Sequence, residues 1–189
     1  MLKQNSLYLG DCIDLFEKVE DHTIDLIFLD PPYNLQLNKV LTRPNHSVVN
    51  GVTQDWDKFD NYASYDEFAL SYLSECKRVL KPDGGLWIIG SYHNIFRIGK
   101  ILQDLNFWIL NDVIWAKSNP LPNFRATRLT NAHETLIWCS KKPKSRYQFN
   151  YHTLKVANED KQERSIWNFP ICSGKERIKN KTNQTAHPT

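Results

Sequence analysis

The sequence predicts an α/β fold in which a Rossmann-like sheet carries helices on both faces. Short apolar runs alternate with segments of helical periodicity through about the first 140 of the 189 residues, which is the pattern of strands connected by helices. One apolar run, residues 24–29, ends at an acidic residue followed by two prolines. A proline disfavours helix in the residue before it, so this strand should stay extended up to the acid.

The first part of the chain predicts two strands, two helices and one long loop. The strands are expected at 6–9 and 24–29, and the helices at 12–19 and 65–80, where apolar residues recur at helical spacing. Residues 35–62 are polar and aperiodic, which predicts a flexible loop. A loop of this length is either a lid over a functional site or a disordered insertion.

The middle of the chain predicts a turn, three strands and a helix. The run Lys-Pro-Asp-Gly-Gly at 81–85 has strong turn chemistry and should stop the preceding helix. Apolar runs predict strands at 86–89, 107–116 and 135–139, and residues 94–105 predict a helix. We therefore expect a core domain that ends near residue 140.

The chain from residue 141 onward loses periodicity and mixes basic with aromatic residues. Residues 1–140 carry 13 Lys and Arg against 17 Asp and Glu, a net charge of −4, whereas residues 141–189 carry 11 against 4, a net charge of +7. This asymmetry favours a polyanionic partner for an irregular basic extension at 141–186. A solvated basic face would have the same composition.

The cysteines and histidines show no metal-binding pattern. The four cysteines are far apart and form no C-x-x-C pair, which argues against a zinc site or a disulfide framework and fits a reducing cytoplasm. The six histidines are not paired at ligand spacing, so we expect no metal. The amino terminus shows no secretory signal, and no apolar run approaches the roughly 20 residues of a membrane helix.

The tetrapeptide Asp30-Pro31-Pro32-Tyr33 follows the strand at 24–29. In open α/β sheets the carboxyl ends of strands form the ligand-binding edge. The Asp30 carboxylate and the Pro31 carbonyl would supply two acceptors for the hydrogens of an exocyclic amine on a flat base. Pro32 would keep the turn rigid, and Tyr33 would offer an aromatic face. Alternatively, the segment is a plain strand exit with a packing tyrosine.

Several short motifs occur in an order that carries a family resemblance. They are Gly10-Asp11-Cys12, Asp30 to Asn34, Trp56-Asp57, Arg78 to Gly85, Trp115-Ala116-Lys117, Asn119-Pro120, His133 to Trp138 and His187-Pro188-Thr189. In this order they resemble the permuted β class of amino-methylating DNA methyltransferases from restriction–modification systems. The resemblance runs across nearly the whole chain.

The resemblance implies a cofactor, a substrate and a set of site residues. It implies S-adenosylmethionine as methyl donor, double-stranded DNA as partner, a flipped base and a cytoplasmic location, with a homodimer as one option. Aspartate at the first catalytic position resembles adenine-N6 enzymes more than cytosine-N4 enzymes. The implied catalytic residues are Asp30, Pro31, Pro32 and Tyr33, and the implied cofactor-binding residues are Asp11, Cys12, Asp30, His187 and Thr189.

Basic residues supply the candidate DNA contacts. Two lie in the Pro-rich loop before His133, and four cluster beside aromatic residues just after the core domain; they are Arg125, Arg128, Lys141, Lys142, Lys144 and Arg146. The competing interpretation is a solubilising loop. Asn94, with His93, either reaches the active-site edge or caps the helix that follows.

The sequence departs from the family pattern in its glycines. The family's cofactor loop has the form F-x-G-x-G, but no two of the seven glycines here are separated by one residue. Residues 187–189 resemble the start of the motif that would precede this loop, so that motif is expected to be truncated. The alternative to an enzyme is therefore a catalytically incomplete DNA-binding subunit.

We expect these 189 residues alone to bind S-adenosylmethionine weakly, because they contain no G-x-G sequence of the kind that wraps the cofactor in the family. Isothermal titration of the chain with S-adenosylmethionine measures this directly. Micromolar binding would contradict the expectation.

Overall fold

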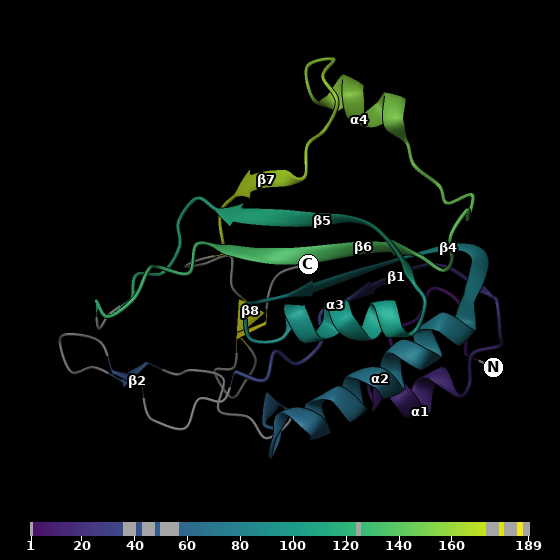
Figure 1. The fold of residues 1–189 in the computed structure, drawn as a ribbon, viewed down its shortest axis with the longest axis horizontal. Coiled ribbons are helices and arrows are strands. Elements are labelled where there is room, and N and C mark those ends of the chain that lie inside the picture. Colours follow the sequence, from purple (N-terminus) through teal and green to yellow (C-terminus); the bar gives the residue numbers. More distant parts are fainter. Residues whose placement is uncertain are drawn as a thin grey trace.

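A computed structural model describes residues 2–35, 41–42, 48–49, 57–123, 126–172, 178–179 and 185–186. Its main feature is one five-stranded mixed sheet with the strand order β1-β4-β6-β5-β7 (Figure 1). The strands of this sheet are β1 (Ile24–Leu29), β4 (Leu80–Gly90), β5 (Trp108–Lys117), β6 (His133–Ser140) and β7 (Ile166–Phe169). The helices are α1 (Cys12–Phe16), α2 (Tyr62–Val79), α3 (Ile95–Asp104) and α4 (Tyr151–Ala157). Two small hairpins pair β2 (Leu41–Thr42) with β3 (Val48–Val49) and β8 (Ile178–Lys179) with β9 (Thr185–Ala186).

The pairing of the strands brings several strand ends together at one edge of the sheet. β1 runs parallel to β4, and β6 runs antiparallel to both β4 and β5. The carboxyl ends of β1, β4 and β5 therefore meet the start of β6, with Gly90 opposite Thr135 and Ala116 opposite His133. The segments that follow β1 and β4 thus lie beside the loop that connects β5 to β6.

The hydrophobic core lies between one face of the sheet and the helices α2 and α3. Alternate strand residues point to this face, and the buried side chains of α2 and α3 belong to the same cluster. From the sheet the cluster takes Ile27, Leu86, Ile88, Ile137 and Cys139. α2 begins with a capping box in which Asn61 and Ser64 bond each other's main chain, and this box fixes where the helix starts.

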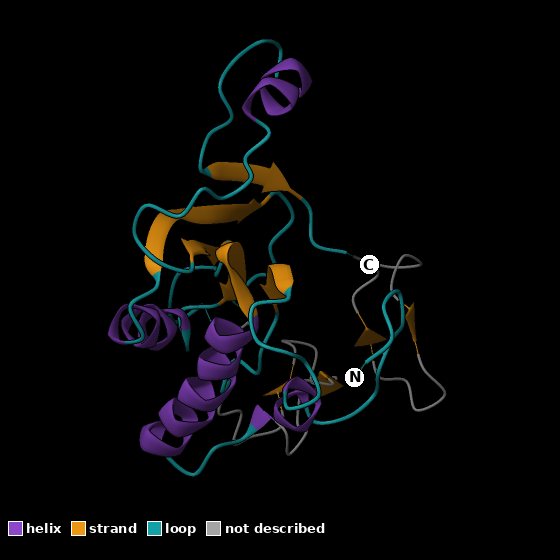
Figure 2. Cartoon of the chain, turned by 90° about the vertical axis from the view of Figure 1, so that its right-hand side faces the viewer, coloured by secondary structure: helices purple, strands orange, loops and turns teal. Residues whose placement is uncertain are grey.

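The opposite face of the sheet carries aromatic rings. Trp87 and Trp138 stack across β4 and β6 with their ring centroids 5.1 Å apart, while Leu26 and Phe28 on the edge strand β1 remain 62% and 60% exposed. Figure 2 shows α4 standing apart from the other helices, beyond β7. The predicted α/β class is confirmed, and in the described part α2 and α3 share one face.

Two elements predicted within the first 90 residues differ in the structure. The strand predicted at 6–9 is wrong, because this segment has no neighbouring strand and leaves Leu7 and Leu9 fully exposed. The turn predicted at 81–85 is a bulge within β4: Leu80 pairs with Ile24 and Gly85 with Leu26, so four residues of β4 face Asp25. The turn formers still end α2 at Val79.

The later part of the chain is more ordered than its composition predicts. α4 and β7 lie where the sequence indicates an irregular extension, and β7 pairs in parallel with β5. A four-residue strand is too short to show a period. Most of the predicted loop at 35–62 falls outside the described residues. Within the described part of the chain, no helix has the length and apolarity needed to cross a membrane.

Candidate active site

The loop that leaves β1 is anchored through the carbonyl group of Pro32. This oxygen accepts a hydrogen bond of 3.1 Å from the Tyr65 hydroxyl and one of 3.4 Å from Nδ2 of Asn94. Nδ2 of Asn94 also donates to the Tyr65 hydroxyl at 3.1 Å. Tyr65 comes from α2 and Asn94 precedes α3, so the two helices under the sheet both hold the loop. Of the two alternatives for Asn94, the structure supports the active-site edge, because its side chain makes no helix cap bond.

The main chain after Tyr33 is anchored by Asp57. The two carboxylate oxygens of Asp57 accept the backbone N–H groups of Asn34 at 2.8 Å and Leu35 at 3.3 Å. Asp57 is only 3% exposed. Asn34 adopts a left-handed backbone with φ of 54°, a conformation that asparagine tolerates better than most residues. Its buried side-chain amide has no hydrogen-bond partner in the structure.

Tyr33 itself is held by a buried ion pair. Its hydroxyl donates to Oε2 of Glu134 at 3.2 Å, and Oε1 of the same carboxylate lies 2.5 Å from Nζ of Lys117. The side chains of Lys117 and Glu134 are only 11% and 16% exposed. Burial, followed by the nearby carboxylates of Glu134 and Asp30, raises the pKa of Tyr33 far above its ordinary value. The phenol therefore stays protonated and acts as a donor.

The predicted cofactor residues fall into two groups. Asp11 and Cys12 open α1, where Oδ1 of Asp11 accepts the N–H of Ile13 at 2.8 Å as a helix cap. Partial burial and the adjacent Asp11 raise the pKa of the Cys12 thiol, which keeps it neutral. His187 and Thr189 lie outside the described residues.

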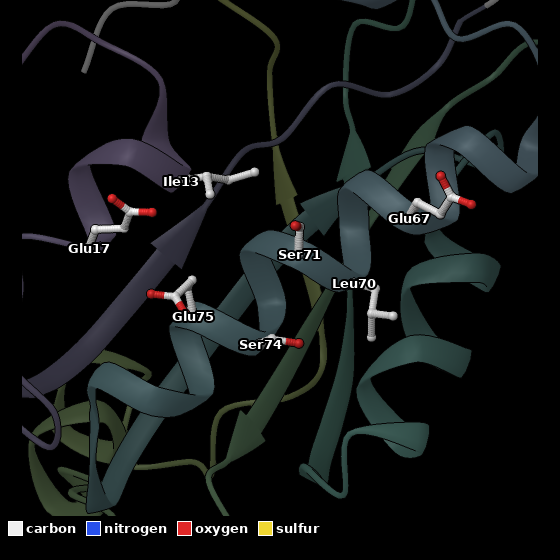
Figure 3. Close-up of a pocket in the computed structure, with 7 residues that line it drawn as sticks. All are labelled: Ile13, Glu17, Glu67, Leu70, Ser71, Ser74 and Glu75. Atoms are coloured by element: carbon white, nitrogen blue, oxygen red, sulfur yellow. The ribbon is translucent and has the colours of Figure 1, made fainter.

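A cavity of about 430 Å³ lies between α1 and α2 (Figure 3). Three of its seven lining residues are glutamates, namely Glu17, Glu67 and Glu75. None of the predicted site residues lines it. Its charge disfavours DNA.

The predicted DNA contacts are divided between the two ends of the sheet. Arg128 lies at the Asp30 edge, where its Nη1 donates to the Tyr92 hydroxyl at 2.8 Å, and Arg125 lies outside the described residues. The cluster of Lys141, Lys142, Lys144 and Arg146 follows the far end of β6. There Nζ of Lys141 bonds the carbonyl of Leu80, and the N–H of Arg146 bonds Asp83. At about 3.3 Å per residue, β6 separates this cluster from the Asp30 edge by roughly 25 Å.

Four residues of the site were not singled out as site residues from the sequence, namely Asp57, Tyr65, Lys117 and Glu134, whereas Asn94 was one of two open alternatives. Three of them stand within motifs that carried the resemblance, but a motif does not say which atom a side chain bonds. Tyr65 looked like one more core residue of an amphipathic helix. Among the described residues, no group of three or more His, Cys, Asp or Glu could hold a metal ion.

Comparisons with known proteins identify the family of the chain. A family model described as DNA methylase, for the N6 and N4 group, matches residues 24–189. The chain is 52% identical over 185 residues to the type II methyltransferase M.HinfI of Haemophilus influenzae, covering 98% of the chain and 52% of that protein. It is 40% identical over 188 residues to the type II methyltransferase M2.MboI of Moraxella bovis, covering 99% and 66%. The chain thus spans between half and two thirds of these curated relatives.

Solved structures share the fold. The PvuII DNA methyltransferase, titled cytosine-N4-specific, superimposes with a TM-score of 0.60 at 18% identity over 89% of this chain and 59% of its own. The M1.HpyAVI–SAM complex gives a TM-score of 0.56 at 19% identity over 87% and 67%. At these identities the likeness concerns the fold alone.

The buried pair of Lys117 and Glu134 should matter for stability. Lys117→Met leaves the Glu134 carboxylate buried without its cation, which we expect to lower the free energy of unfolding by about 3 kcal/mol. Adding Glu134→Gln should recover most of this loss. Denaturant unfolding measures both, with Lys100→Met as the control, because the Lys100–Asp104 pair is largely exposed and should contribute less than about 1 kcal/mol. Equal losses for the two lysines would contradict the prediction.

Proposed function

Because the chain belongs to the N6 and N4 family of DNA methylases, we propose that it transfers a methyl group from S-adenosylmethionine to the N6 amine of an adenine flipped out of duplex DNA. One observation carries this proposal. The segment Asp30–Tyr33 follows the carboxyl end of β1, and hydrogen bonds hold the peptide groups on both sides of Tyr33. Among the described residues, none donates a hydrogen bond to the Pro31 carbonyl. That oxygen is therefore available to a substrate amine beside the Asp30 carboxylate.

The chemistry follows from the weakness of an aromatic amine as a nucleophile. Its lone pair is delocalised into the ring, and two acceptors on its hydrogens draw the nitrogen toward a tetrahedral geometry. Asp30 and the Pro31 carbonyl serve as these acceptors, preorganised by the hydrogen bonds that hold the loop. The amine becomes acidic as it gains the methyl group, so the Asp30 carboxylate can take the released proton without a raised pKa.

Tyr33 receives the flipped base. Extruding a base from a duplex costs a few kcal/mol, and stacking on an aromatic ring returns roughly 1–3 kcal/mol. The hydrogen bond of Tyr33 to Glu134 fixes the ring before the base arrives. Less ordering is then needed when the substrate binds.

S-adenosylmethionine supplies an electrophilic methyl group when it is bound. Asp11 fits a role in holding it, because helix capping uses Oδ1 and the residue is exposed. Its second oxygen can accept a hydroxyl or amine of the cofactor. The solved M1.HpyAVI structure with a similar fold is titled as a SAM complex, which supports the same cofactor here.

Cytosine N4 is the second candidate target. The fold neighbour titled cytosine-N4-specific favours it, whereas aspartate at position 30 favours adenine by resemblance. Both amines present the same two hydrogens to Asp30 and Pro31. Transfer of a labelled methyl group to DNA, followed by base analysis, separates adenine, cytosine and no transfer at all.

Substitution of Asp30 should abolish the activity in the intact protein. Asp30→Asn keeps an acceptor but takes no proton, and we expect kcat to fall by about 10²–10⁴-fold. Tyr33→Phe keeps the stacking ring and should lose far less than Tyr33→Ala. Labelled methyl transfer measures all three variants. Normal transfer by Asp30→Asn would contradict the proposed mechanism.

Charge reversal should show which end of the sheet contacts DNA. Arg128→Glu removes a cation at the Asp30 edge, so we expect weaker DNA binding and a salt slope reduced by about one. Lys142→Glu makes the same change in charge at the far end of the sheet. It should weaken DNA binding only if the duplex reaches that end. Binding titrations at several salt concentrations compare the two variants. An unchanged Arg128→Glu variant would exclude this arginine from the DNA interface.

A further inference from the structure

We propose that Asp57, Tyr65 and Asn94 are positioning residues for methyl transfer, and that position 90 must be glycine for Asn94 to act. Their role is to fix the two peptide groups that flank Tyr33, which in turn places Asp30 and the Pro31 carbonyl. The inference rests on the proposed function for its kinetic consequences. Its structural content is independent of any activity.

The need for external anchors arises from the two prolines. Pro31 and Pro32 have no N–H group, so this part of the loop cannot be held by hydrogen bonds that its own amides donate. It can be held through its carbonyl oxygens. Because the Pro31 carbonyl is the one assigned to the substrate, the Pro32 carbonyl is the group left for the protein to hold.

The Pro32 anchor is buried and its orientation is fixed. Asn94 is 1% exposed and Tyr65 is fully buried. Oδ1 of Asn94 accepts the N–H of Ser91 at 3.0 Å, so Nδ2 is directed to the Pro32 carbonyl and the Tyr65 hydroxyl. Burial raises the pKa of Tyr65 to about 12, which keeps its hydroxyl protonated as a donor to Pro32.

The second anchor lies on the other side of Tyr33. Asp57 binds the amides of Asn34 and Leu35 with one carboxylate oxygen each. The left-handed backbone at Asn34 turns the chain so that both amides face the same carboxylate. Hydrogen bonds therefore fix the Pro32 carbonyl before Tyr33 and the amides of Asn34 and Leu35 after it.

Gly90 lies directly against the Asn94 side chain. A Cβ atom at position 90 would approach Oδ1 of Asn94 to 2.6 Å and its Cγ and Nδ2 to 3.2 Å. These atoms belong to a short amide that is bonded at both ends, so an added methyl group displaces it. Gly90→Ala should therefore release the Pro32 carbonyl without touching the loop itself.

A double-mutant cycle in the intact protein tests the coupling. A 1 Å misplacement of reacting groups costs about 10²-fold in rate, so Gly90→Ala and Asn94→Ala should each lower kcat by about that factor. KM for DNA and for S-adenosylmethionine should change little. The double variant should be no slower than Asn94→Ala alone, because the group that Gly90→Ala displaces is gone. Losses that multiply, or a normal kcat in either single variant, would overturn the proposal.

The chain offers matched controls for both kinds of substitution. At Gly99 a Cβ would meet Cδ1 of Ile137 at an ordinary 3.5 Å, so Gly99→Ala should leave kcat unchanged. Tyr72 lies on the same helix as Tyr65, and its buried hydroxyl has no hydrogen-bond partner in the structure. Tyr72→Phe should therefore keep the wild-type rate, whereas Tyr65→Phe lowers kcat. Equal rates for the two tyrosine variants would count against the proposal.

Hydrogen exchange tests, without any catalytic turnover, whether these residues hold the peptide groups next to Tyr33. Asp57→Ala should speed exchange in the peptide that contains the amides of Asn34 and Leu35, and Asp57→Asn should do so less because it keeps one acceptor. Gly90→Ala should speed exchange in the same peptide, while Gly99→Ala should not. If the wild-type protein transferred no methyl group, the proposed function would be refuted, but the positioning role would not. Unchanged exchange in Asp57→Ala would refute the positioning role.

Discussion

The hydrogen bonds to the Pro32 carbonyl are the constraint on which the site depends. A segment of two prolines is stiff in φ but donates no hydrogen bond, so its place in the fold is set by what its carbonyls accept. Tyr65 and Asn94 meet this oxygen from two different helices. The core that packs α2 and α3 against the sheet therefore also determines where the catalytic loop lies, and packing and chemistry share the same side chains.

Charge at the Asp30 edge is balanced within the protein. Two carboxylates, Asp30 and Glu134, both influence the Tyr33 hydroxyl, and like charges this close are costly unless a cation is near. Lys117 provides that cation to Glu134 in a nearly dry setting. Glu134 therefore carries a paired charge, and its carboxylate holds the aromatic ring through the Tyr33 hydroxyl.

Local patterns predict most of the fold and the loop that follows β1, but not the groups that support this loop. The strand at 24–29 and the helix periodicity at 65–80 are local signals, and the structure confirms both elements within a few residues. The pairing of Leu80 with Ile24 and of Gly85 with Leu26 is a long-range property, so the turn formers between them gave no sign of a bulge. In the sequence Tyr65 looks like a core residue, and Asn94 fits either a helix cap or the active-site edge. Their bonds to Pro32 join residues 33 and 62 positions apart along the chain.

The position of the basic cluster at 141–146 is a feature of the fold that composition alone does not predict. Its charge is real, but the main chain there is bonded to the bulge of β4 at the end of the sheet opposite Asp30. The loop between β5 and β6 lies at the Asp30 edge, where the proposed function expects a duplex to deliver its base. There the exposed Arg128 packs over Tyr92, with its guanidinium 5.6 Å from the ring centre. A cation braced on an aromatic ring is already ordered, so a phosphate contact there costs less conformational entropy than one made by a freely moving lysine. Under the proposed function, we therefore expect the cations at the Asp30 edge to matter more for base delivery than the larger number at the far end.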